Sequence, residues 1–251
     1  MNTKDKIREL VKQYYRETVD RRYYKGKTYI PAAKAYYDEK ELTALVEASL
    51  DMRWVDGEIT KRFEKEMAKF MGVRFAIMVN SGSSANLLAL SSLTSDLFKS
   101  NKLSPGDEVI TVAAGFPTTV NPIIQNGLIP VFVDINLGTY NTTAHYVDAA
   151  ITEKTKAIFI AHTLGNPYDV DEIKELAKIH NLWLIEDVCD AIGAEYDGKK
   201  VGTFGNVSTT SFYPAHLMSV GEGGMVFTDS PLVAKADGLI VTGKQIGRAH
   251  V

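Results

Sequence analysis

The sequence predicts an α/β fold in which helices cover both faces of a mostly parallel sheet. Five short apolar runs with the length of buried strands lie between residues 75 and 187, and helical stretches separate several of them. This alternation is typical of a parallel sheet, because each crossover returns the chain to the same end of the sheet. Two further strand-like runs, VSTTSFY and GGMVFT, are late strands of the same domain.

The amino-terminal segment precedes this alternation and is expected to be helical. Residues 1–24 have the pattern of a polar amphipathic helix, and a connector with proline and glycine follows. Residues 41–51 and 59–71 are also predicted to be helical, the second because its apolar residues recur at three- and four-residue spacing. We therefore expect a helical arm over residues 1–40 and one large domain over residues 41–240.

The ends of the predicted strands carry the unusual residues of the sequence. The five earlier strands are FAIMV (75–79), EVITV (108–112), PVFVDI (130–135), AIFIAH (157–162) and LWLIED (182–187), and a helix is predicted over 171–180. The segments NSGSSAN, AGFPTT, EDVCDA and SFYPAH stand at strand ends. Ligands of such sheets bind beyond the carboxyl ends of the strands, so we expect the functional site there.

Composition excludes several classes of protein. The chain has 28 Lys and Arg against 31 Asp and Glu, a formal charge of −3, and so has no field of one sign for nucleic acid or an anionic membrane. No apolar run is long enough to span a bilayer, and the polar amino terminus has no signal-peptide core. One cysteine, Cys189, excludes an internal disulfide and a cysteine-rich metal site. We expect a cytoplasmic enzyme without a metal site in this chain.

The segment SGSSAN (81–86) is a turn of small residues that leads directly into a helix. Free amide groups at a helix start, with the helix dipole and serine hydroxyls, suit a phosphate group. A serine that caps an ordinary helix explains the same pattern. The nucleotide-binding pattern GxxxxGK[ST] is absent, so this is not a P-loop.

Two strand ends offer groups for a charged aromatic ligand. Asp187 ends LWLIED, where a carboxylate can hold a positive charge such as a protonated ring nitrogen, or can cap the next turn. Glu186 and Asp190 are close in sequence, and spacing alone does not rank the three. Phe116 follows a strand within a turn of small residues, where it can stack on a flat ring or pack in the core.

His216 stands between the last two predicted strands, after a Pro-Ala turn and before a glycine-rich segment. A lone histidine is more often structural than catalytic, but this context favours a site residue. His162, at the end of another strand, is the second candidate and would lie on the substrate side. HExxH, a Cys/His cluster and GxSxG are all absent, which argues against metal-dependent and serine hydrolases.

Taken in order, SGSSAN, AAGFPTTVNPIIQNGLIPVFVD, HTLGNP, LIEDVCDA and SFYPAH…GEGGMVFT resemble one family. This is the DegT/DnrJ/EryC1/StrS sugar aminotransferase family of pyridoxal-phosphate (PLP) fold type I, and the resemblance runs from about residue 40 to about residue 229. It implies a large domain with a seven-stranded, mostly parallel sheet between two helix layers. It also implies a smaller carboxyl-terminal domain that this chain lacks.

The resemblance assigns roles at the cofactor phosphate and ring. Gly82 and Ser83 are expected to bind the phosphate, with Ser211 as a second contact. Phe116 is expected to stack on the pyridine ring.

Further roles concern the charges around the ring. Asp187 is expected to pair with the pyridine nitrogen and keep it protonated. Asp190 takes a position near the ring hydroxyl where the aminotransferases have Gln or His. His216 takes the position of the Schiff-base lysine, which imidazole cannot replace, and this matches the family's sugar 3-dehydratases, which bind pyridoxamine phosphate (PMP) and use histidine as the base.

The implied activity is C3 dehydration of a nucleotide-linked 4-keto-6-deoxyhexose for dideoxysugars of lipopolysaccharide O-antigen. The CDP-linked glucose derivative is the first expected substrate, and the GDP-linked mannose derivative is the alternative. In the CDP-sugar case a [2Fe–2S] cluster and a flavin reductase would deliver electrons, with cluster cysteines beyond the present chain. A non-catalytic binding protein that keeps the cofactor fold is the remaining alternative.

The resemblance also bears on assembly and on the end of the chain. Family members are homodimers whose sites form at the subunit interface, so we expect a homodimer of the intact protein. The terminal residues IGRAHV resemble the translation of a sequencing adapter. We therefore expect residues 241–251 to be a non-native tail and the chain to be an inactive fragment.

Overall fold

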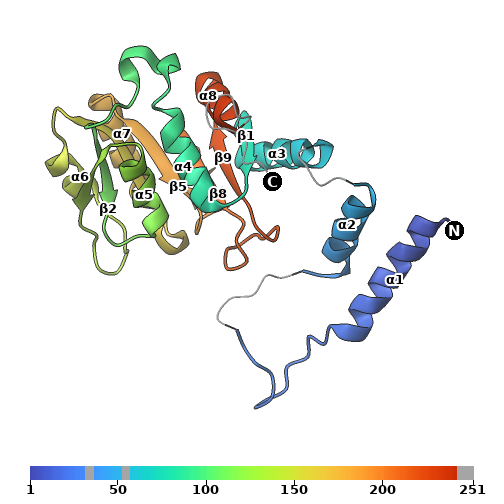
Figure 1. Ribbon diagram of the computed structural model, residues 1–251. Coiled ribbons are helices and arrows are strands. Elements are labelled where there is room, and N and C mark those ends of the chain that lie inside the picture. Colours follow the sequence, from blue (N-terminus) through green and yellow to red (C-terminus); the bar gives the residue numbers. More distant parts are fainter. Residues whose placement is uncertain (32–36, 53–56, 242–251) are drawn as a thin grey trace. The chain divides into compact units, whose positions relative to one another are not determined.

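The computed structural model describes residues 1–31, 37–52 and 57–241, which divide into two compact units (Figure 1). The first unit is Met1–Arg62 and the second begins at Phe63. The predicted boundary after residue 40 lies within the first unit. Apart from Val241, the predicted tail lies outside the described residues, as does part of the predicted connector.

Among its described residues, the first unit contains two whole helices, α1 (Thr3–Thr18) and α2 (Glu39–Leu50), and the start of α3 (Glu58–Met71). Each whole helix begins with a capping box, in which the side chains of the N-cap residue and of the third helical residue bond reciprocally to backbone N–H groups. Ion pairs such as Arg16–Glu39, at 2.8 Å, join the helices, and no α1 residue is buried. The helix predicted over 1–24 ends at Thr18, and Val19 has an extended backbone. Thr18 and Val19 are both β-branched, which lowers their helix propensity.

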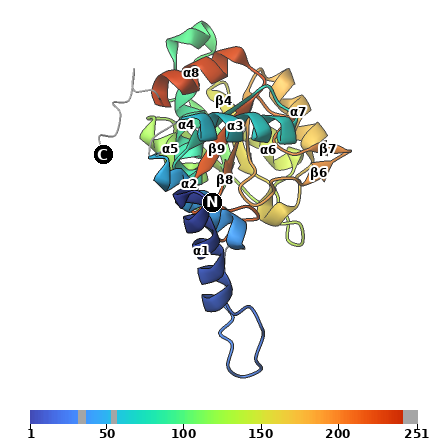
Figure 2. The same ribbon diagram turned by 90° about the vertical axis from the view of Figure 1, so that its right-hand side faces the viewer.

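The second unit contains a seven-stranded sheet in the order β1-β9-β8-β5-β4-β2-β3. Strand β9 is antiparallel to β1 and β8, and the other pairs are parallel, so the predicted fold class is confirmed. The strands lie within two residues of the predicted ranges: β1 Phe75–Val79, β2 Glu108–Val112, β3 Ile129–Val133, β4 Thr155–Ala161, β5 Trp183–Asp187, β8 Val207–Ser211 and β9 Gly224–Thr228. Strands β6 (Glu195–Tyr196) and β7 (Lys199–Lys200) form a separate hairpin (Figure 2).

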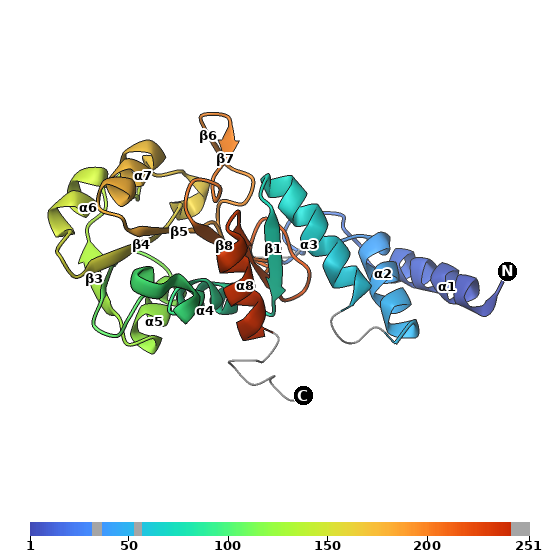
Figure 3. The ribbon, with the colours of Figure 1, turned by 90° about the horizontal axis from the view of Figure 1, so that it is seen from above.

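Helices lie on both faces of this sheet (Figure 3). In β9, Val226 packs in one core cluster with α4, α5 and α8, whereas its neighbours Met225 and Phe227 pack on the opposite face against the end of α3. Helices α6 and α7 cover that opposite face over β4 and β5. The helices are α3 Glu58–Met71, α4 Gly82–Ser92, η1 Asp96–Asn101, α5 Pro117–Gln125, α6 Ala144–Ala150, η2 Thr163–Gly165, α7 Val170–Ile179 and α8 Pro231–Val241.

Among the described residues, no helix combines the length and apolar character needed to cross a membrane.

Candidate active site

A cavity of about 540 Å³ lies at the carboxyl ends of the parallel strands. Four strand-end segments that the sequence singled out contribute to its wall, together with the starts of α4 and α5 and the connection between β8 and β9. The lining residues are Ser81, Gly82, Ser83, Gly115, Phe116, Thr118, Thr119, Ala161, Thr163, Asp187, Cys189, Asp190, Ser211, Tyr213, Ala215, His216 and Glu222. Seven of the eight predicted site residues therefore lie together, and His162 is the exception.

The start of α4 presents free amide groups to the cavity. Ser81 is the N-cap, and its Oγ accepts from the backbone N–H of Ser84 at 3.1 Å. Gly82 and Ser83, the first two helical residues, have no acceptor for their N–H groups within the helix. The serine N-cap is therefore present, and two amide groups remain at the helix start that an anion can bind.

Ser211, at the end of β8, closes this amide cradle from the opposite side. A Cβ on Gly82 would lie 2.4 Å from Ser211 Cβ, so only glycine permits the two segments to approach so closely. The Ser211 hydroxyl accepts from the backbone N–H of Tyr213 at 3.2 Å. Its own proton can therefore point to a ligand oxygen, and the cradle fits a phosphate group.

Asp187 is the carboxylate that β5 presents to the cavity. Its Oδ2 accepts from Asn86 Nδ2 at 2.9 Å and from Thr119 Oγ1 at 3.0 Å. Its Oδ1 accepts from the backbone N–H of Cys189 at 3.0 Å. Three donors hold the side chain, which is 95% buried at the cavity wall, where its carboxylate can bind a protonated ring nitrogen.

Glu186 points to the other face of the sheet and does not line the cavity. Three backbone N–H groups of residues 202–205 donate to it at 2.5–2.8 Å, and His162 Nε2 lies 3.0 Å away. The His162 ring is fully buried and stacks on Tyr168 with a centroid distance of 4.1 Å. His162 therefore has no contact with the cavity, because its ring turns from the strand end toward Glu186.

His216 lies in the connection between β8 and β9, with its ring next to Asp190. His216 Nδ1 and Asp190 Oδ1 are 3.2 Å apart. Because Nδ1 faces a carboxylate, it carries the proton of the neutral ring and leaves Nε2 as the basic nitrogen. A ring held in this way through one nitrogen can act as a general base through the other.

Phe116 occupies the N-cap position of α5, ahead of Pro117. Its side chain lines the cavity yet remains 71% exposed, so one face of the ring is available to a flat ligand. The core-packing alternative does not fit this exposure.

The cavity also has lining or supporting residues that the sequence pattern did not indicate, namely Asn86, Thr119, Cys189, Tyr213 and Glu222. Asn86 lies one helical turn after Gly82, and that spacing within SGSSAN was the available signal. Cys189 lies beside Asp187, and burial, together with the Asp187 charge, raises the pKa of its thiol well above its usual value. The thiol therefore stays protonated and is a poor nucleophile.

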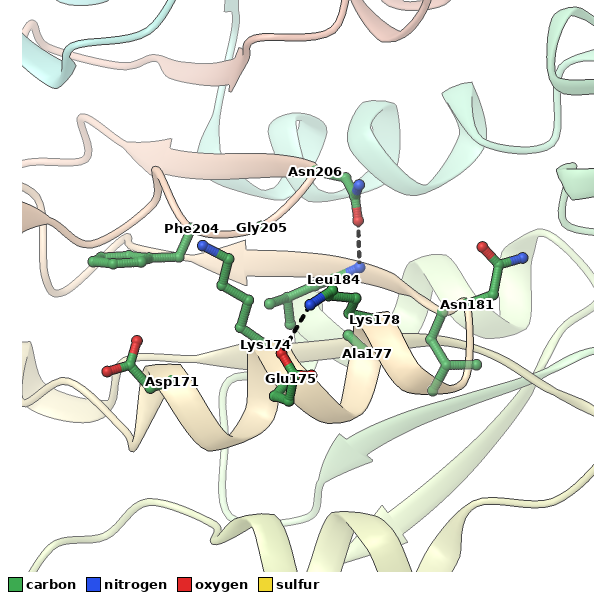
Figure 4. A pocket seen from close by; sticks show the side chains of 11 residues that line it. Asp171, Lys174, Glu175, Ala177, Lys178, Asn181, Leu184, Phe204, Gly205 and Asn206 are labelled. Atoms are coloured by element: carbon green, nitrogen blue, oxygen red, sulfur yellow. Dashed lines mark hydrogen bonds and ion pairs between the residues drawn. The ribbon is translucent and has the colours of Figure 1, made fainter.

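A second hollow, of about 800 Å³, lies at the amino ends of β5 and β8 between α7 and residues 204–206 (Figure 4). Its floor is closed by Leu184, whose backbone N–H donates to Asn206 Oδ1 at 2.8 Å. On its rim Lys178 pairs with Glu175 at 3.4 Å. None of the predicted site residues lines it, and parallel sheets bind their ligands at the other end.

The family model of the DegT/DnrJ/EryC1/StrS aminotransferase family matches residues 36–247. The chain belongs to this family.

Curated members of the DegT/DnrJ/EryC1/StrS family resemble the chain over most of its length. It is 55% identical to "dTDP-4-dehydro-2,6-dideoxy-D-glucose 3-dehydratase" of Saccharopolyspora spinosa, over 93% of this chain and 51% of that protein. It is 53% identical to "Lipopolysaccharide biosynthesis protein RfbH" of Salmonella typhimurium, over 91% of this chain and 53% of that protein. The chain thus spans about half the length of these relatives.

Solved structures of the family show the same fold. The E. coli GDP-4-keto-6-deoxy-D-mannose-3-dehydratase with bound hydrated PLP superposes with a TM-score of 0.80 and 34% identity, over 88% of this chain and 57% of that one. An aminotransferase from Psychrobacter cryohalolentis superposes with a TM-score of 0.77 and 29% identity, over 89% and 57%. The second unit therefore has the large-domain architecture of PLP-dependent fold type I.

Proposed function

We propose that the chain is the cofactor-binding part of an enzyme that uses PMP to remove the C3 hydroxyl group of a nucleotide-linked 4-keto-6-deoxy sugar. The observation that carries this proposal is His216, which stands at the cavity wall with Nδ1 held by Asp190. Relatives named as sugar 3-dehydratases, at 55% and 40% identity, support the same reaction class.

The cavity fits the cofactor on the grounds of its own residues. The Gly82 and Ser83 amides and the Ser211 hydroxyl would hold the phosphate, since a Cβ at position 82 would fill this cradle. Phe116 would cover one ring face, and Asp187 would hold the protonated ring nitrogen. When bound, the cofactor supplies an electron sink next to the reacting carbon.

His216 performs the proton transfer in this proposal. Its Nε2 would take a proton at the cofactor's C4′ carbon while Asp190 holds the ring through Nδ1 and stabilises the imidazolium that forms. The cofactor, joined through its amine to sugar C4 in place of the ketone oxygen, would pass the electron pair to the sugar so that the C3 hydroxyl group leaves as hydroxide. A lysine here would form a covalent link to the cofactor, so the histidine favours dehydration over ordinary amino transfer.

A second part of the proposal concerns which nucleotide the sugar substrate carries. The CDP-linked sugar stays our first prediction. Because two relatives are named for dTDP- and GDP-linked sugars, those two substrates are tested as well. A [2Fe–2S] cluster with its reductase, and a homodimer, also stay predictions. The single cysteine of this sequence cannot supply a cluster's ligand set.

The test uses sugars that carry ¹⁸O at C3. Because this chain alone is expected to be inactive, the intact protein that contains it is loaded with PMP, mixed with the CDP-, GDP- or dTDP-linked 4-keto-6-deoxy sugar, and assayed for labelled water. We expect release with one nucleotide above the others and loss of release in His216→Ala. Cofactor binding without labelled water from any sugar would favour the non-catalytic alternative, and unimpaired release in His216→Ala would refute the base assignment.

A further inference from the structure

Behind Asp187 lies a buried polar chain that the proposed chemistry does not yet use. Asn86 of α4 and Thr209 of β8 are fully buried. Asn86 Oδ1 accepts from Thr209 Oγ1 at 2.5 Å, and Asn86 Nδ2 donates to Asp187 Oδ2 at 2.9 Å. The second hydrogen on Nδ2 reaches the carbonyl oxygen of Thr118 at 3.1 Å. One side chain thus ties α4, α5, β5 and β8 together.

The orientation of the Asn86 amide is determined by its partners. The Thr118 carbonyl oxygen can only accept, so the amide nitrogen must face it. Exchange of Oδ1 and Nδ2 would place one oxygen against a carbonyl and a carboxylate, and would leave the Thr209 hydroxyl facing an N–H group. The amide therefore presents a donor to Asp187, and it cannot serve as an acceptor there.

The N–H group that Asn86 donates affects whether the proton shared between a pyridine nitrogen and Asp187 lies on the nitrogen or on the carboxylate. Hydrogen bonds to a carboxylate favour its charged form over its protonated form. Asp187 receives donors from Asn86, Thr119 and the Cys189 backbone, so a shared proton is pushed from the carboxylate to the ring nitrogen. The electron sink depends on that protonated nitrogen.

We infer that Asn86 is a positioning residue that keeps Asp187 ionised toward the cofactor ring and thereby keeps the ring nitrogen protonated. Asn86 lies one helical turn after Gly82, so a single rigid helix carries both the phosphate cradle and the support of the ring-nitrogen acid. The inference rests on the proposed function, since it assumes that this cavity binds the pyridine cofactor.

The test places the proton directly. PMP labelled with ¹⁵N at the pyridine nitrogen is bound to the full chain, and its nitrogen chemical shift is measured by NMR at neutral pH. In the unsubstituted chain we expect the shift of a protonated ring. In Asn86→Ala the ratio of ring-protonated to carboxylate-protonated forms is expected to fall at least about tenfold, because one hydrogen bond to a charged group is lost. The shift then moves toward that of an unprotonated pyridine.

Two further variants separate positioning from simple packing. Thr209→Val removes the hydroxyl that orients the amide, with little change in volume, and should move the shift in the same direction by less. Asn126→Ala is the matched control: Asn126 Nδ2 also bridges α4 and α5, through Ser91 Oγ at 3.0 Å and the Pro122 carbonyl at 2.8 Å, but has no contact with Asp187. It should lower the melting temperature and leave the nitrogen shift unchanged.

The outcomes distinguish this inference from the function beneath it. If Asn86→Ala and Thr209→Val destabilise the fold but keep the nitrogen shift of the unsubstituted chain, Asn86 only packs and the inference is wrong. If the unsubstituted chain binds no PMP, both the proposed cofactor site and the inference fail. Binding with the expected shifts supports both.

Discussion

Glu186 and Asp187 are consecutive carboxylates at the end of one strand, and their surroundings differ in kind. Glu186 is enclosed by backbone N–H groups of residues 202–205 and by His162. Asp187 is held largely by side chains from α4 and α5 and lies at the cavity wall. Both have their donors, but only one has access to a ligand. Strand alternation thus turns one carboxylate toward buried backbone donors and its neighbour toward the cavity.

The structural carboxylate should show the largest effect on stability. Glu186→Ala leaves three buried N–H groups and His162 without their acceptor, so we expect the free energy of unfolding to fall by about 4 to 6 kcal/mol. Urea unfolding followed by circular dichroism measures it. Glu195→Ala, which removes an exposed carboxylate paired with Lys200 at 3.7 Å, is the control and should have little effect. A loss below about 1 kcal/mol in Glu186→Ala would contradict this role.

Asp237 of α8 extends the comparison to a carboxylate that is buried without donors. Within the described part of the chain neither of its oxygens has a hydrogen-bond partner, and the nearby Ser92 hydroxyl donates to the Ala89 carbonyl at 2.9 Å. Burial raises the pKa of Asp237 to about 8, with Ser92 opposing the shift. The folded-state pKa lies above the unfolded value, so the stability contribution is complete below about pH 4 and is lost as the pH rises to 8.

Asp237→Asn removes this titration. Its amide remains without partners, which offsets part of the gain, so we expect about 2 kcal/mol of added stability at pH 8 and a flatter pH dependence between pH 4 and 8. Urea midpoints at four pH values across this range give the comparison. If the urea midpoints of the two chains changed with pH in the same way, Asp237 would not be a buried acid without a partner.

Substitution of Asp187 should lower cofactor affinity strongly and stability only slightly, the reverse of what is expected for Glu186. Asp187→Asn keeps the size of the side chain but cannot neutralise a protonated ring nitrogen, so PMP affinity should fall about 100-fold. The free energy of unfolding should change by only about 1 kcal/mol, since one oxygen acceptor remains. An absorbance titration and urea unfolding of the same preparation measure both. Equal affinity in the two chains would remove Asp187 from the site.

Asp190 should show the smallest effect, confined to the rate. Asp190→Asn removes the charge beside His216 Nδ1, and we expect the release of C3-labelled water to slow about tenfold, the equivalent of ~1.4 kcal/mol in the barrier. PMP affinity should stay within about twofold. A change in affinity without a change in rate would place Asp190 at the ring rather than at the base.

Much of the fold and the site followed from local pattern. Apolar runs marked five strands, since buried parallel strands are continuous apolar segments, and the strand-like runs VSTTSFY and GGMVFT marked β8 and β9. Strand ends collected the SGSSAN turn, Phe116, Asp187 and His216 in one cavity. His162 was placed on the substrate side because it ends a strand, yet its ring turns away toward Glu186. Sequence gives a residue's position along a strand but not the direction of its side chain.

The supporting contacts could not be predicted from spacing. Asn86 and Asp187 are 101 residues apart, and their hydrogen bond exists only because α4 packs over the carboxyl end of β5. The choice among Glu186, Asp187 and Asp190 likewise needed the layers on each side of the sheet. Tertiary packing, rather than local propensity, decides both.

The most direct test of the central claim, that His216 stands at the reacting side of a pyridine-cofactor site, is to place a lysine there. His216→Lys is incubated with PLP, reduced with borohydride and analysed by peptide mass spectrometry. We expect a stable cofactor adduct on the peptide that contains position 216, and no adduct on that peptide in the unsubstituted chain. Labelling spread over surface lysines alike in both chains would contradict the account, because position 216 would then not face the bound cofactor.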